Sequence, residues 1–89
     1  MKKAVVSVIG KDKKGIIAGV TKELFELNIN VADITQTIMQ EYFTMIMLVE
    51  IDENANFNHI VNRLNLVGEG LGVTVSIQHE EIFDSMHKI

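Results

Sequence analysis

The residues near the N-terminus that could do chemistry lie between two glycines. Gly10 and Gly15 enclose residues 11–14, which are three lysines and one aspartate. Two glycines at this spacing occur in phosphate-binding loops, in which a lysine and a hydroxyl residue follow the second glycine and contact phosphate and magnesium. Here Ile16 and Ile17 occupy those positions. We therefore do not expect this segment to hydrolyse a nucleotide.

The charged residues of this segment have two interpretations each. Asp12 stands where a helix N-cap is expected, and its carboxylate can accept hydrogen bonds from the first turn or contact a ligand. Lys11, Lys13 and Lys14 either stay in solvent or bind an anion. Each exposed cation at a helix N-terminus opposes the helix dipole by about 0.3–1 kcal/mol, and a negatively charged ligand would reverse the sign.

The remaining residues with catalytic potential do not converge. The chain has no cysteine, which removes disulfides, thiolate metal sites and cysteine nucleophiles. No serine, histidine and acid fall together on one predicted surface. His79, Glu80, Glu81 and His87 could hold a metal if the C-terminal tail folds back, but their spacing matches no recognised zinc site. We expect no enzymatic activity, no cofactor and no metal.

The elements that must position these residues follow from apolar periodicity. Alternating or β-branched runs predict strands, and apolar residues three and four apart predict amphipathic helices. Asn54 or Asn56 is the expected N-cap of the second helix, and Gly68, Gly70 and Gly72 are expected to close it. The predicted elements are strand 4–9, helix 15–27, strand 31–40, strand 43–51, helix 57–71 and strand 73–78.

This order, β-α-β-β-α-β, predicts an α+β fold of the ferredoxin-like class. Right-handed crossovers would give one four-stranded antiparallel sheet with both helices on one face. We expect one domain over 1–79 and a C-terminal extension over 80–89, which forms a short docked helix or an arm. If Phe43, Met45, Met47 and Val49 point to the second face of the sheet, that face is too apolar to meet water unaided. The methionines are interpreted as core or interface filler rather than as ligand contacts.

Bulk composition limits the partners. The chain has 89 residues, 47% of them hydrophobic, and so apolar a small domain often pairs with a second copy. The net charge of −4 and the lack of aromatic residues in the first strand disfavour nucleic acid, RNA included. No apolar run approaches the length of a membrane span. We expect a cytoplasmic protein that binds neither nucleic acid nor membrane.

The stretch from Gly10 to Ile34, GKDKKGIIAGVTKELFELNINVADI, resembles the signature of ACT domains. In that family a strand ends in a glycine-bounded loop, a helix of small and aliphatic residues follows, and an Asn-aliphatic pair opens the second strand. Lys14 departs from the pattern, because many members have proline there. The positions that match are Gly10, Asp12, Gly15, Ile16, Asn30 and Val31.

This resemblance, which covers about residues 3–79, implies a regulatory module. ACT domains usually accompany catalytic or DNA-binding domains and bind small ligands, often amino acids, between two ACT modules. A chain this short has no room for a second domain, so its output would pass through a partner protein or self-association. Gly10 stands where serine-binding members can have a polar side chain, so serine is not the expected ligand. The implied ligand-binding residues are Gly10, Lys11, Asp12, Lys14, Gly15, Ile16, Asn30 and Val31.

The length of the first helix indicates how these residues could meet. Asp12 precedes the helix and Asn30 follows it, so about 12 to 15 helical residues separate them by roughly 20 Å. One chain cannot place both on one amino acid, whereas a two-fold dimer with antiparallel first helices can. Asp12 could receive the ligand ammonium, Gly15 would let backbone N–H groups approach its carboxylate, and Asn30 offers donor and acceptor.

Two other functions compete with ligand binding. The chain could be a ligand-free interaction module that uses an apolar sheet face or its tail. It could also be a small enzyme such as an acylphosphatase, but that chemistry needs an arginine in a phosphate-binding loop. The only arginine, Arg63, falls in the second predicted helix, so the enzyme is the least favoured of the three.

Overall fold

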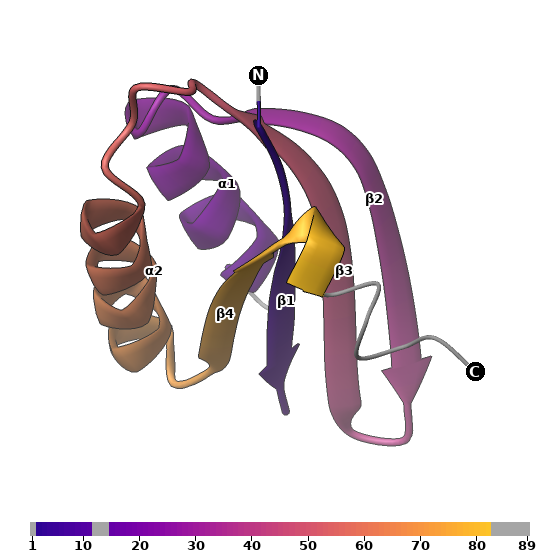
Figure 1. Ribbon diagram of the computed structural model, residues 1–89. Helices are drawn as coiled ribbons and strands as arrows, with labels where there is room; N and C mark the ends of the chain where they lie inside the picture. The colour runs from indigo at the N-terminus through magenta and orange to yellow at the C-terminus, as the bar shows by residue number, and fades with distance from the viewer. Residues whose placement is uncertain (1, 12–14, 83–89) are drawn as a thin grey trace.

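The computed structural model describes residues 2–11 and 15–82. The predicted order of elements is confirmed, and a further helical turn begins at Glu80. The four strands form one antiparallel sheet in the order β2-β3-β1-β4, and both helices cover one face of it (Figure 1). This is the ferredoxin-like fold. The elements are β1 (Lys2–Gly10), α1 (Ile16–Glu26), β2 (Asn30–Met39), β3 (Tyr42–Ile51), α2 (Phe57–Leu71) and β4 (Thr74–His79).

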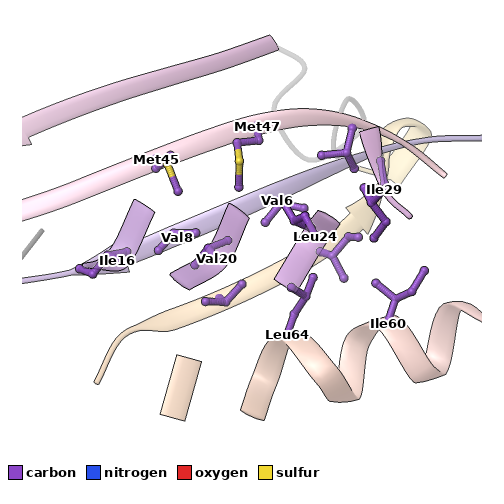
Figure 2. Close-up of a cluster of buried hydrophobic side chains, with 14 of the residues drawn as sticks. Val6, Val8, Ile16, Val20, Leu24, Ile29, Met45, Met47, Ile60 and Leu64 are labelled. Atoms are coloured by element: carbon purple, nitrogen blue, oxygen red, sulfur yellow. The ribbon is translucent and has the colours of Figure 1, made fainter. Parts of the chain in front are cut away.

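The core lies between the sheet and the two helices. Ile16, Val20 and Leu24 recur every four residues of α1, so their side chains lie on one buried stripe. They meet Met45 and Met47 of β3 in Figure 2, together with inward side chains of β1 and α2. The two methionines are fully buried. Their interpretation as core filler is therefore confirmed, and the alternative that their row faces away from the helices is wrong.

The second face of the sheet carries the other row of each strand. On β3 this row consists of Tyr42, Thr44, Ile46, Leu48 and Glu50, which alternate with the buried row. Cross-strand partners share a face, and the partners of Thr44, Ile46 and Leu48 on β1 are Ile9, Ser7 and Val5. We call this face the open face, because α1 and α2 lie on the other one. It mixes polar and apolar side chains.

The two helices are held together by a close approach and an ion pair. A Cβ atom on Gly19 would lie 2.9 Å from Leu71 Cδ1, so the Leu71 side chain packs directly against this glycine and would have to shift if a larger residue stood there. Glu23 is buried, and its Oε2 accepts from Arg63 Nε at 2.8 Å and lies 2.7 Å from Arg63 Nη2. The only arginine in the sequence therefore joins α1 to α2.

The β2–β3 connection differs from the predicted one by a residue. The turn consists of Gln40 and Glu41 rather than Glu41 and Tyr42, and Tyr42 pairs with Met39. Gln40 takes a left-handed conformation with φ 56°, which suits the twist of a two-residue hairpin. The difference is only one residue, because the apolar runs that form β2 and β3 leave room for a turn of just two residues.

The boundaries of α2 confirm one prediction and correct another. Asn56 is the N-cap of α2, and its side chain accepts from His59 N at 3.1 Å, which confirms one of the two expected residues. The helix does not close at Gly68 or Gly70, since it runs through both to Leu71. Gly72 alone supplies the left-handed C-cap, with φ 72°. Of the described helices, none combines the length and apolar character needed to cross a membrane.

Candidate functional site

Gly10 ends β1 and lies close to Val73, which connects α2 to β4. Gly10 pairs with Phe43 at the end of β1. A Cβ atom on Gly10 would clash with the side chain of Val73, so a larger residue there would force the α2–β4 connection away from the end of β1. Lys11 follows, and its Nζ lies 5.8 Å from the centroid of the Tyr42 ring. This cation–π contact directs Lys11 toward the start of β3.

The start of α1 differs from the prediction. The N-cap position belongs to Gly15, with φ 75° and no side-chain hydrogen bond, and not to Asp12. A left-handed φ favours glycine there, and nothing lies within 4 Å of where its Cβ would be. Ile16 is buried, so it presents its backbone rather than its side chain to the loop. Asp12, Lys13 and Lys14 lie outside the described residues.

Asn30 opens β2 at the other end of the sheet. Its Nδ2 donates to Glu50 Oε1 at 2.9 Å, and the two residues are cross-strand partners. Because Glu50 lies between the buried residues Val49 and Ile51, this pair is on the open face. Val31 pairs with Val49 on the helix side. The two adjacent candidate residues therefore present their side chains to opposite faces.

A bulge in β2 explains why Val31 lies on the helix side. Val31 opposes Val49 and Asp33 opposes Leu48, so Ala32 is the extra residue. Strict alternation along β2 would place Val31 with Asp33, on the opposite face from Ile34. The bulge shifts the pattern by one residue, and Val31 shares the helix side with Ile34, which pairs with Met47.

Within one chain, the two halves of the candidate site lie at opposite ends of the sheet. Gly10 pairs with Phe43, and Asn30 pairs with Glu50. Seven residues of β3 separate Phe43 from Glu50, which at a rise of about 3.3 Å per residue is about 23 Å. This agrees with the separation expected from the helix length. A single amino acid cannot span it, so one chain does not bring these residues together.

An apolar edge lies beside this candidate site, and the sequence did not reveal it. β2 is an edge strand. Ile34 and Ile38 pair with the buried residues Met47 and Phe43, yet their side chains are 41% and 55% exposed on the helix side. On α1, Phe25 is 80% exposed. The alternation of residues in β2 is consistent with an apolar row that includes Ile34 and Ile38. The position of β2 at the edge of the sheet explains why the helices leave this row exposed.

The histidines and acids do not form a second site in the described residues. No group of three metal-ligating side chains occurs there. His79 stacks on Phe57, with ring centroids 4.2 Å apart and planes at 20°, and so joins the end of β4 to the start of α2. His87 lies outside the described residues. Nothing in the described part of the chain therefore favours the metal alternative for the His79 region.

The comparison with protein families decides which class this chain falls into. The family model for the ACT domain matches residues 2–78. The chain belongs to the ACT domain family. It is 52% identical over 88 residues to a UPF0237 protein of Clostridium acetobutylicum, with 98% of this chain and 99% of that protein covered. It is 51% identical over 90 residues to a UPF0237 protein of Methanocaldococcus jannaschii, with both chains covered fully.

A solved structure agrees with this assignment. The ACT domain protein from Streptococcus pneumoniae superposes with a TM-score of 0.84 and is 43% identical. The match covers 93% of this chain and 94% of that one. These relatives are small proteins of similar length from bacteria and an archaeon.

Proposed function

We propose that this ACT protein is a non-catalytic regulator that binds an amino acid or a similar small metabolite between two copies of the chain. The main support for this proposal is a distance: Gly10, where the loop begins, and Asn30 both match the ACT signature and lie about 23 Å apart in one chain. A site that uses both needs a second protomer. Ligand binding then acts on a partner protein or changes the self-association of this chain. The cytoplasmic location expected from the sequence is also part of this proposal.

The uncovered edge supports a specific arrangement of the dimer. The strand β2 offers unpaired backbone groups along its outer edge in the described part of the chain, and Ile34 and Ile38 beside it are exposed. Such edges pair readily with another strand. A two-fold axis beside β2 makes the α1 helices of the two copies antiparallel, so the loop of one copy approaches Asn30 of the other. Each dimer then has two equivalent sites.

The residues have complementary tasks in such a site. The first N–H groups of α1 have no partner within the helix and lie at the positive end of the helix dipole, and α1 has no acidic residue in its first turn. These groups suit the ligand carboxylate, with Lys11 and Lys14 adding positive charge nearby. Asp12 suits the ammonium group. The Asn30 side chain lies on the open face, where its Nδ2 donates to Glu50, so in such a site it turns from Glu50 around the start of β2 to offer its amide to the ligand.

Calorimetry with the twenty amino acids tests the proposal on a dimer whose mass has been verified in solution. We expect at least one amino acid to bind, and both Asn30→Ala and Asp12→Ala to weaken that binding. Asn62→Ala is the matched control, because Asn62 is an exposed residue of α2 that faces away from the core. No heat of binding from any amino acid would rule out the amino-acid version.

A ligand-free interaction module remains the second candidate. The observation that favours it is the open face, where Ile9, Met39 and Tyr42 are 51%, 70% and 48% exposed. Deletion of residues 80–89, followed by mass measurement of the protein and its complexes, tests the version that uses the tail. An unchanged mass and unchanged partner binding would eliminate that version.

A further inference from the structure

The open face has a groove that the proposed ligand site does not use. Its volume is about 230 Å³, and it lies where β1, β2 and β3 run side by side. The groove is lined by the apolar residues Val5, Ile46 and Leu48. It is also lined by two acidic residues, Asp33 on the edge strand β2 and Glu80 just after β4. An apolar groove beside acidic groups suits an apolar segment that also carries positive charge.

Coverage of the open face changes along β1. Val5, Ser7 and Ile9 all point to this face, since they pair with Leu48, Ile46 and Thr44. Val5 is 6% exposed, whereas Ile9 is 51% exposed. The helices cannot be the cause, because they lie on the other face. In Figure 1 the helical turn that begins at Glu80 lies in front of β1, at the end of the sheet where the face is covered.

We infer that the open-face groove is the docking site of this chain's own C-terminal segment, residues 83–89. The described chain ends at Ile82, two residues after Glu80, which lines the groove. The segment therefore starts at the edge of its own binding site, and its attachment gives it a high effective concentration there. This inference does not depend on the proposed amino-acid site.

The composition of the segment matches the groove. Phe83, Met86 and Ile89 are apolar, and Lys88 supplies a positive charge that can pair with Asp33, whereas Asp84, the one acidic residue of the segment, has to stay on the solvent side when the segment docks. A cavity of about 150 Å³ can hold a benzene molecule, so a groove of about 230 Å³ has room for one phenyl ring. Phe83 is the aromatic residue of the segment and takes this place.

The length of the segment is also sufficient. Seven extended residues reach about 23 Å, and crossing from β1 over β3 to β2 requires two strand spacings, or about 10 Å. The segment can therefore cross the groove to β2 in the same chain. Docked there, it covers apolar residues of the open face and competes with any second protein that would bind to that face.

Disulfide trapping tests the inference cleanly, because the chain has no cysteine of its own. Thr35 lines the groove, whereas its neighbour Gln36 pairs with the buried Met45 and so faces the helix side. We expect the Thr35→Cys, Met86→Cys variant to form an intramolecular disulfide under mild oxidation several-fold more than the Gln36→Cys, Met86→Cys control. Equal yields, or disulfides formed mainly between chains, would overturn the inference.

Two extensions make the experiment independent of the register of the segment. Cysteine is placed in turn at each of positions 84–87 opposite Thr35→Cys, and no intramolecular cross-link at any of them would also overturn the inference. In the best-linked pair, Ile46→Thr removes apolar surface from the groove and should lower the yield several-fold. Ile9→Thr, on the same face but outside the groove, should leave the yield unchanged.

Discussion

Two glycines in one helix should respond in opposite ways to the same substitution. Gly68 and Gly70 both lie within α2, and replacing a helical glycine with alanine favours folding by about 0.5–1 kcal/mol. At Gly70 a Cβ atom meets nothing within 4 Å, so Gly70→Ala should stabilise the protein by the full amount. At Gly68 the new Cβ would lie 2.8 Å from the backbone oxygen of Val73 and 3.3 Å from the backbone nitrogen of Val75.

The contacts at Gly68 cannot relax easily. Val75 belongs to β4 and pairs with Val8 of β1, so β4 cannot move away without disturbing the sheet. Forcing extra atoms into a packed core costs about 1–3 kcal/mol. Gly68→Ala should therefore be less stable than Gly70→Ala by about 1–3 kcal/mol, with the propensity gain common to both.

Urea unfolding at one fixed protein concentration measures this difference, since the stability of the proposed dimer would depend on concentration. With equal slopes, the midpoints should rank Gly70→Ala above the wild type and Gly68→Ala at or below it. For a domain of this size, 1 kcal/mol corresponds to about 4–8 °C in Tm. Equal stabilisation by both substitutions would refute the close packing of α2 on β4.

Three further substitutions test other contacts. Arg63→Met leaves the buried Glu23 carboxylate without its partner and should cost about 1–3 kcal/mol in urea unfolding; adding Glu23→Gln should recover part of it, and no recovery would contradict the pairing. Asn56→Ala removes a cap and should cost about 1 kcal/mol by the same measurement, whereas no loss would contradict the cap. Ile38→Lys on the uncovered edge should lower the molar mass measured by sedimentation from that of a dimer toward that of a monomer, whereas Thr37→Lys, on the opposite face, should leave it unchanged. A lower mass for Thr37→Lys but not for Ile38→Lys would place the interface elsewhere.

The sequence predicted the types and order of the elements because each has a clear apolar rhythm. It also predicted the amphipathic helix that carries the buried stripe of Ile16, Val20 and Leu24, and it gave Asn56 as one of two candidate caps. Both features depend on local spacing and local hydrogen bonds. It did not predict which row of β3 meets the helices, because both rows contain apolar residues. Burial separates them, since Met45 is fully buried whereas Ile46, the next residue, is 38% exposed.

The candidate site was predictable in part for a related reason. The large separation of its two halves follows from the length of α1, which sequence periodicity gives. The bulge at Ala32 and the hydrogen bond from Asn30 to Glu50 depend on pairing with β3, and alternation within β2 carries no information about that pairing. The left-handed cap at Gly15 likewise depends on the loop geometry, whereas the preference of aspartate for caps favoured Asp12.

The claim that the ligand site is shared between two protomers can be tested by mixing two defective variants. In a dimer of one Asp12→Ala chain and one Asn30→Ala chain, one site carries both substitutions and the other carries neither. Unfolding and refolding an equal mixture should therefore restore about one quarter of the wild-type number of calorimetric binding sites, at wild-type affinity. Each variant refolded alone should restore no site of wild-type affinity. If the mixture binds no better than the separate variants, although mixed dimers have formed, the site lies within one chain and the account is contradicted.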